Sequence, residues 1–144
     1  MSGTTPATVR FYIDADILGL GKLLAGLRSD VTHPGDPGAT IKRRSRPACV
    51  VTTPATLDSD WIPIVSQQGL VIITRDRSIQ RHPAEVGAVV ANVGKMVALS
   101  GPDAVTTWDQ LEVVMCQWRR IEALVDLPGP FVYTATRTSL VKVV

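Results

Sequence analysis

The sequence is poor in the residues that build disulfide and transition-metal frameworks. Its 144 residues include two histidines and two cysteines, Cys49 and Cys116, and the cysteines form no C-x-x-C pair. These numbers argue against a histidine metal cluster, a zinc-binding cysteine framework and a disulfide-stapled fold. We therefore expect reduced thiols and a cytoplasmic protein.

The sequence also shows neither a long hydrophobic run nor the pattern of a standard signal peptide. No apolar run approaches the roughly 20 residues that a membrane helix needs. The opening "MSGTTPATVR" has no basic segment followed by an apolar core, which a standard signal peptide would show. We expect neither a membrane segment nor secretion by such a signal.

The chain has no large excess of charge of either sign. Its formal net charge of +2 does not suit a generally basic coat for nucleic acid. Positive charge is concentrated in "IKRRSR" (41–46) and "RDRSIQR" (75–81). A solvated surface is the ordinary explanation of such runs, but basic segments among carboxylates would also suit a polyanion held beside a metal ion.

What is present predicts one α/β domain over residues 1–144, because 45% of the residues are hydrophobic and the length suits a single core. Apolar runs and helical periodicity alternate along the chain. We expect strands over 8–13, 47–53, 70–74 and 95–100, helices over 17–28, 57–69, 82–94 and 107–126, and one or two closing strands within 131–144. This order predicts a three-layer α/β/α fold around a central, mostly parallel sheet.

Carboxylates follow two of the expected strands. Asp14 and Asp16 come after the first strand and Asp76 after the central one, while Asp58 and Asp60 open the helix before the central strand. In open α/β sheets the functional crevice lies beyond the carboxyl ends of the strands. Each residue alone also suits a helix cap or a turn. Together they indicate an acidic site where a hard cation such as Mg²⁺ would offset the repulsion between the carboxylates.

At these residues the chain resembles a known family. "FYIDADILGLGKLLAGLRSDV", "HPGDPG", "DSDWIPIVSQQGLVIITRDRSI", "RHPAE" and "GPFVYTAT" are similar, in order, to motifs of PIN-like domains related to VapC-type toxin ribonucleases. The central block, with its D-x-D-W helix and its T-R-D strand ending, is the most specific. The resemblance covers most of the chain, and segments 38–50 and 100–126 fit it only loosely.

The resemblance implies a Mg²⁺- or Mn²⁺-dependent endoribonuclease, usually the toxin of a toxin–antitoxin pair. Asp14, Asp58 and Asp76 match its acidic catalytic and metal-binding positions, and Asp60 matches the acidic position beside the tryptophan. Asp16 and Asp60 would assist at the metal. The family generally has a further acidic residue after the first helix, and Asp36 is the candidate there.

The implied partners are RNA and a cognate antitoxin. We expect flanking phosphates of the RNA to contact the basic residues Arg75, Arg77, Lys42, Arg43 and Arg44. The helix over 107–126 carries one apolar stripe, formed by Trp108, Leu111, Met115, Trp118, Ile121 and Leu124. This stripe is most simply core, although it would also serve a homodimer.

Two other functions stay open at this point. "YIDADI" also resembles the D-x-D strand end of haloacid-dehalogenase-like phosphatases, whose other motifs are not evident. Alternatively, a non-catalytic PIN-like module would bind nucleic acid without cleaving it, and the missing acidic residue after the first helix favours that alternative.

Overall fold

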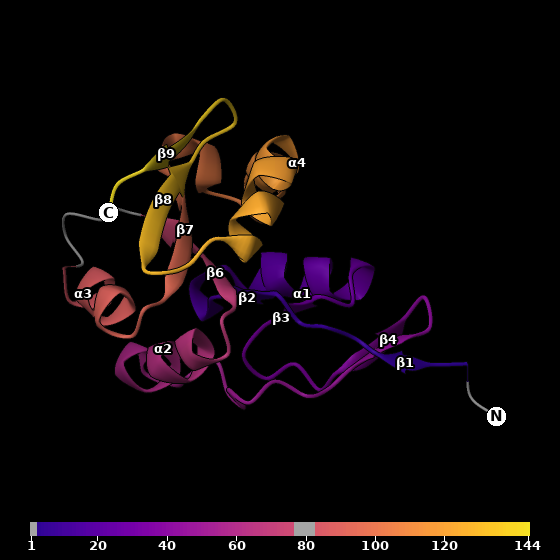
Figure 1. Cartoon of the computed structure of the whole chain (residues 1–144). Helices are drawn as coiled ribbons and strands as arrows, with labels where there is room; N and C mark the ends of the chain where they lie inside the picture. The colour runs from indigo at the N-terminus through magenta and orange to yellow at the C-terminus, as the bar shows by residue number, and fades with distance from the viewer. Residues whose placement is uncertain (1–2, 77–82) are drawn as a thin grey trace.

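The computed structural model describes residues 3–76 and 83–144, without the side chains of residues 76, 102 and 103. The larger of its two sheets has the strand order β3-β2-β6-β7-β8-β9 (Figure 1). These strands are β2 (Phe11–Ile13), β3 (Val31–Thr32), β6 (Val71–Asp76), β7 (Lys95–Ser100), β8 (Phe131–Ala135) and β9 (Leu140–Lys142). Only the edge strand β9 is antiparallel to its neighbour, so the sheet is mostly parallel, as predicted.

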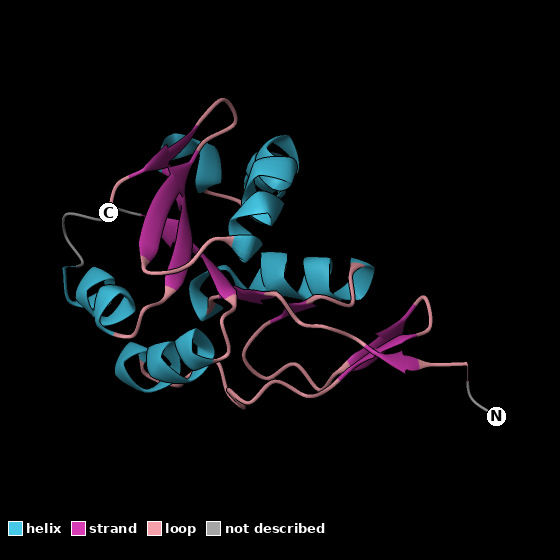
Figure 2. Ribbon diagram, viewed as in Figure 1, coloured by secondary structure: helices cyan, strands magenta, loops and turns pink. Residues whose placement is uncertain are grey.

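Helices cover both faces of this sheet (Figure 2). They are α1 (Leu18–Leu27), α2 (Asp58–Gln67), α3 (Pro83–Ala91) and α4 (Thr107–Ala123), with short 3-10 turns at Ala15–Ile17, Gly101–Ala104 and Leu124–Asp126. Phe11 and Ile13 of β2 face the core formed with α1 and α4, whereas Tyr12 faces the core formed with α2 and α3. Successive side chains of a strand point to opposite faces, so both faces of β2 are buried. The predicted three layers are confirmed.

The chain reverses its direction of travel across the sheet next to β2. It passes from β2 to the neighbouring β3, returns through α2 to β6 on the other side of β2, and then continues outward to β7 and β8. This 2-1-3-4-5 order places a topological switch point between β2 and β6, where such folds bind their ligands. A helix that leads into a parallel strand runs antiparallel to it, so α2 begins at the carboxyl edge of the sheet.

Two glycines allow α1 to lie close to its neighbours. A Cβ atom on Gly21 would be 3.1 Å from Cβ of His33 and 3.2 Å from Cβ of Ile13. A Cβ atom on Gly19 would be 2.7 Å from Oγ1 of Thr107, at the start of α4. A side chain at either position would have to displace these neighbours.

A second, smaller sheet projects from the main body near the N-terminus (Figure 1). It contains β1 (Thr5–Pro6), β5 (Arg44–Arg46) and β4 (Ala39–Ile41), and β4 and β5 form a hairpin. The strand predicted over 47–53 is wrong, because this segment is a loop. Its backbone makes isolated hydrogen bonds to the preceding loop, from Cys49 N to Asp36 O (2.9 Å) and from Gly35 N to Val51 O (2.8 Å).

The apolar stripe predicted for the last helix is buried in part: Ile121 and Leu124 lie in the core, and Leu111 and Trp118 pack partly buried against it. Trp108 and Met115 are 75% and 70% exposed, whereas Gln110 and Gln117 are buried. Gln110 Nε2 donates to Ala104 O (3.1 Å) and Gln117 Nε2 to Thr136 O (3.0 Å), so both buried amides donate a hydrogen bond.

Within residues 3–76 and 83–144, no helix has the length and apolar character needed to cross a bilayer.

Candidate active site

Asp14 lies where β2 ends, at the switch point of the sheet. Its backbone N–H donates to Ile73 O of β6 (2.9 Å), which fixes the end of β2 against the neighbouring strand. The hydroxyl of Thr74 donates to Asp14 Oδ2 (2.8 Å). Asp14 is only 7% exposed. The strand end therefore holds a nearly buried carboxylate in a fixed position.

Asp16 lies beside it in the 3-10 turn that leads into α1. Its carboxylate accepts a hydrogen bond from the backbone N–H of Arg75, and Thr74 Oγ1 is 3.4 Å from Asp16 Oδ1. The Asp16 side chain is open to solvent, unlike that of Asp14. Residues 74 and 75 of β6 thus hold both carboxylates together at one edge of the sheet.

The carboxylate pair concentrates negative charge. Burial raises the pKa of Asp14 to about 7, and the neighbouring charges of Asp16 and Asp58 add to this shift, while the hydrogen bond from Thr74 opposes it. Partial desolvation raises the pKa of Asp16, and the charge of Glu85 raises it further. Carboxylates that are desolvated and close to one another hold protons strongly, and they bind a cation for the same reason.

Asp58 opens α2 near the same edge. Its Oδ1 accepts a hydrogen bond from Nε1 of Trp61 (2.9 Å), and the Trp61 ring stacks on Tyr12 of β2 with centroids 4.9 Å apart. The charge of Asp58 contributes to the raised pKa of Asp14. The start of α2 therefore faces the site, as expected for a helix that precedes a parallel strand, and its carboxylate is solvent-exposed.

Glu85 is a further acidic residue at this edge, and the sequence analysis missed it. It lies in the first turn of α3, and its charge raises the pKa of Asp16. The same rule that places Asp58 applies to it, since α3 also precedes a parallel strand, β7. The signal that would have found it is an acidic residue in the first turn of the helix after the T-R-D strand.

The remaining predicted acidic residues differ in their surroundings. Asp60 is exposed in the first turn of α2. Asp76 ends β6 two residues after Thr74, and its side chain lies outside the described part of the chain. Asp36 is buried and accepts hydrogen bonds from Arg46 Nε (2.7 Å) and Thr32 Oγ1 (2.8 Å). The carboxylate of Asp36 is thus engaged by Thr32 of β3 and Arg46 of β5.

The predicted basic residues fall into two places. Arg75 is half-buried in β6 beside the acidic edge, with its Nε atom buried, and Arg77 lies outside the described residues. Lys42, Arg43 and Arg44 belong to the β4–β5 hairpin, beyond the other end of α1. The structure therefore separates the hairpin cations from the acidic edge by the length of α1, which is about 15 Å for ten residues.

The donor atoms at the acidic edge fit a hard divalent cation. Asp14 and Asp16 supply carboxylate oxygens side by side, and burial together with the charges of neighbouring carboxylates raises the pKa of each. Mg²⁺ is usually held by one or two protein carboxylates together with waters and substrate phosphates. Among the described side chains, no three His, Cys, Asp or Glu residues are close enough to enclose a metal by themselves. The arrangement therefore suits a partly hydrated ion rather than a closed protein cage.

The sequence matches one family model, described as a PIN-like domain, over residues 10–101. This range includes the strand ends at Asp14 and Thr74, the start of α2 at Asp58 and the start of α3 at Glu85. It leaves out α4, β8 and β9. Comparisons with curated proteins and with solved structures gave no significant match.

Proposed function

Because the chain belongs to the family of PIN-like domains, we propose that it is a metal-dependent endoribonuclease whose cleavage site is the acidic edge at Asp14. PIN domains are generally nucleases, which supports hydrolysis of a nucleic acid. The observation that carries the proposal is the nearly buried Asp14 beside Asp16, with Asp58 close by, at the switch point of the sheet. RNA as the substrate rests on the resemblance to toxin ribonucleases.

In this proposal the residues at the edge have distinct roles. Asp14 and Asp16 hold a Mg²⁺ or Mn²⁺ ion, Asp58 and Asp76 complete the acidic site, and Asp60 assists through water. Thr74 fixes the Asp14 carboxylate by its 2.8 Å hydrogen bond. A divalent ion held by these carboxylates would supply a water of lowered pKa for attack on the phosphodiester and would offset negative charge on the phosphoryl group. Trp61 leaves Oδ2 of Asp58 available because its N–H binds Oδ1.

Cleavage of RNA by point variants tests this assignment. Wild-type protein with Mn²⁺ or Mg²⁺ is expected to cleave a labelled single-stranded RNA, and chelation by EDTA to stop it. Asp14→Asn should lower the cleavage rate by at least about 100-fold, since it removes a charged ligand of the ion. Asp58→Asn should lower it by a smaller factor, because Asp58 is exposed and already binds Trp61.

The matched control is Asp126→Asn, which removes one negative charge from an exposed position in the 3-10 turn after α4, outside the acidic edge. Its cleavage rate should stay within about twofold of the wild-type rate. Residual cleavage of equal size in wild type and Asp14→Asn would identify a contaminating nuclease and contradict the proposal. The fold of each variant is checked by circular dichroism before its rate is compared.

A nucleic-acid-binding module without cleavage is the second candidate. It is favoured by one observation, that the described side chains contain no cluster of three metal-binding residues. RNA binding that is independent of metal, together with an absence of cleavage by wild type, would support this module. The phosphatase alternative has no support, since the family that matches is the PIN-like one.

An antitoxin partner, a homodimer and a cytoplasmic location stay predictions from the sequence. The gene beside this one tests the first, because a toxin of this kind would be encoded next to a small DNA-binding protein. Co-purification of the two products would support a toxin role. Light scattering on the purified chain measures whether it is a dimer.

A further inference from the structure

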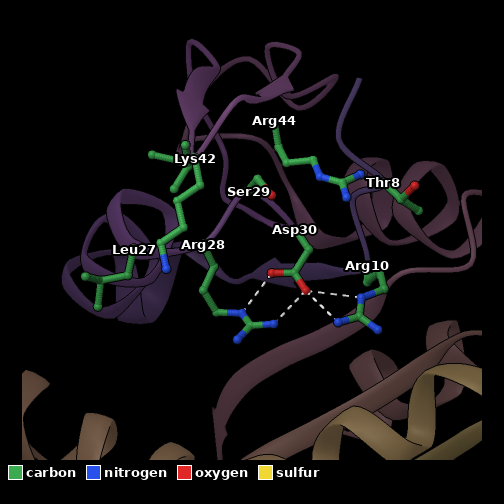
Figure 3. Close-up of a pocket in the computed structure, with 9 residues that line it drawn as sticks. Thr8, Arg10, Leu27, Arg28, Ser29, Asp30, Lys42 and Arg44 are labelled. Atoms are coloured by element: carbon green, nitrogen blue, oxygen red, sulfur yellow. Dashed lines mark hydrogen bonds and ion pairs between the residues drawn. The ribbon is translucent and has the colours of Figure 1, made fainter. Parts of the chain in front are cut away.

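A pocket of about 580 Å³ lies at the end of α1 opposite to the acidic edge (Figure 3). Its walls come from the segment before β2, the turn between α1 and β3, and the β4–β5 hairpin. Its charged lining residues are four cations, Arg10, Arg28, Lys42 and Arg44, and one carboxylate, Asp30. The hydroxyls of Thr8 and Ser29 complete the polar lining. This volume and this polarity suit a phosphate-bearing group.

Two of the cations, Arg10 and Arg28, are held in place by ion pairs with carboxylates. Asp30 Oδ2 accepts hydrogen bonds from Arg10 Nη2 (2.7 Å) and Arg28 Nη2 (3.0 Å), and Glu122 Oε2 is 3.1 Å from Arg10 Nη2. Burial by itself would raise the pKa of Asp30, but the two arginines lower it below its usual range, so Asp30 stays charged. The Arg28 guanidinium also lies over the Trp118 ring, 4.7 Å from its centroid. Both arginines are therefore preorganised, and the two carboxylates balance their charge.

Among the described residues, no carboxylate balances the charge of the other two cations, Lys42 and Arg44. Lys42 and Arg44 make no ion pair within residues 3–76 and 83–144. Figure 3 shows the Lys42 side chain extending toward Arg28 and the Arg44 side chain extending toward Thr8. With Asp30 and Glu122 balancing the two arginines, the pocket keeps an excess positive charge of about two units. An anion in the pocket would contact Lys42 and Arg44 of the hairpin as well as the fixed Arg10 and Arg28.

The turn of the β4–β5 hairpin has an unusual backbone conformation. Lys42 and Arg43 have positive φ angles of 48° and 66°, where glycine or asparagine is normally found. Residues with long side chains are strained in this region, and they persist there where the surrounding structure imposes the conformation. The register pairs Ile41 with Arg44, so the two turn residues carry charge at the tip of the hairpin.

We propose that this pocket binds a phosphate group of a nucleic-acid strand, away from the site of cleavage. The nucleic-acid identity of the ligand rests on the proposed function, whereas the preference for a phosphate rests on the pocket itself. Asp14 and Arg28 lie at opposite ends of α1, so a strand that reaches both must span several nucleotides. The pocket would anchor the strand and leave the chemistry to the acidic edge.

Binding in EDTA tests this without any cleavage. The affinity of a labelled single-stranded RNA of about ten nucleotides is measured by fluorescence anisotropy over a range of NaCl concentrations. Lys42→Gln and Arg44→Gln should each weaken binding by about fivefold and lower the slope of log K against log [salt] by about 0.7. The double variant should lose about the product of the two factors, unless both cations contact one phosphate.

Arg43→Gln is the matched control. Arg43 is in the same turn and its replacement changes net charge equally, but its side chain lies toward Gly3 and does not line the pocket. Its affinity should stay within about twofold of wild type. An equal loss in Arg43→Gln and Arg44→Gln would mean that only overall charge matters, which would overturn the proposal.

A nucleoside monophosphate separates a strand from a free ligand. Calorimetry should give a dissociation constant of about 1 mM or weaker for the mononucleotide and wild type. RNA should bind much more tightly. Tight mononucleotide binding that Arg44→Gln removes, with RNA affinity unchanged, would overturn the proposal in favour of a small-molecule site. If wild type binds RNA through the pocket but never cleaves it, the proposed nuclease function fails and the pocket stands.

Cleavage kinetics provide a further readout. A dinucleotide is too short to reach both ends of α1, so its cleavage should be equal in wild type and in Lys42→Gln/Arg44→Gln. For the longer RNA the double variant should raise KM and leave kcat unchanged, because the anchor binds ground state and transition state alike. A fall in kcat on the dinucleotide would contradict the anchoring role.

Discussion

Replacing Asp14 by Asn is expected to make the protein more stable at pH 8 when no divalent metal is present. In the folded protein burial and the neighbouring carboxylates raise the pKa of Asp14 from 3.8 to about 7. Between these values the folded state binds more protons than the unfolded state, so the stability of the wild type falls as pH rises. Asn carries no charge, and its amide oxygen can still accept the hydrogen bond from Thr74.

The expected gain for Asp14→Asn is roughly 2 to 4 kcal/mol at pH 8 and close to zero at pH 3.5. Urea denaturation in EDTA, followed by circular dichroism across this pH range, measures the difference. Addition of Mn²⁺ should raise the midpoint of the wild type and leave the variant unchanged, because only the wild type retains the ligand.

Asp60→Asn is the control for this experiment, since Asp60 is an exposed carboxylate in the first turn of α2. This variant retains Asp14, so its stability should follow that of the wild type within about 0.5 kcal/mol at both pH values. A variant Asp14→Asn that is less stable than wild type at pH 8 in EDTA would mean that the buried carboxylate has a balancing partner. That result would remove the electrostatic argument for a cation at this edge.

The buried pair of Arg46 and Asp36 should give the largest loss of stability. Arg46 Nε donates to Asp36 Oδ2 (2.7 Å), and Arg46 Nη1 donates to the carbonyl oxygens of Ala25 and Arg28 (3.0 Å each) at the end of α1. Both charged residues are 4% exposed. Arg46→Met would leave the Asp36 charge and two carbonyl groups buried without this partner. We expect a loss of about 3 to 5 kcal/mol, measured by urea denaturation at pH 7.

Two further variants distinguish the ion pair from simple loss of packing. Arg44→Met removes a cation from the same strand at an exposed position, and it should change stability by less than about 0.5 kcal/mol. Asp36→Asn combined with Arg46→Met should cost less than the sum of the single changes, because no unpaired charge stays buried. Additive losses would show that Arg46 acts through its contacts with α1 alone.

The local pattern of the sequence predicted the strands of the main sheet except β3, and the helices that cover the sheet. Residues 11–13 and 71–74 are continuous apolar or β-branched runs that precede carboxylates, and both became central parallel strands. The segment 47–53 has similar β-branched residues but forms a loop, since its hydrogen bonds go to the turn around Asp36. The face of α4 was predicted from hydropathy alone, which could not show that Gln110 and Gln117 would be buried as hydrogen-bond donors.

The basic hairpin shows a similar limit. "IKRRSR" contains three arginines and a lysine, and its composition predicted a solvated surface. Its partners are distant in the sequence: β1 pairs with β5, and Arg46 reaches the end of α1 to bind Asp36. Of the cations in this run, the fold buries Arg46 and leaves Lys42 and Arg44 free over a pocket. Composition cannot show which of these cations is buried and which is free, because burial depends on long-range contacts.

The sequence by itself determined the layer architecture and the acidic strand ends, because the periods of 2.0 and 3.6 residues and the carboxylates after the strands are local properties of the chain. Only the tertiary structure decided that Thr74 and Arg75 hold Asp14 and Asp16 together, that Glu85 joins them, and that Asp36 pairs with Arg46 instead. It also placed the hairpin cations at the far end of α1. Burial and charge neighbours set the pKa of a carboxylate, and both arise only when distant segments pack together.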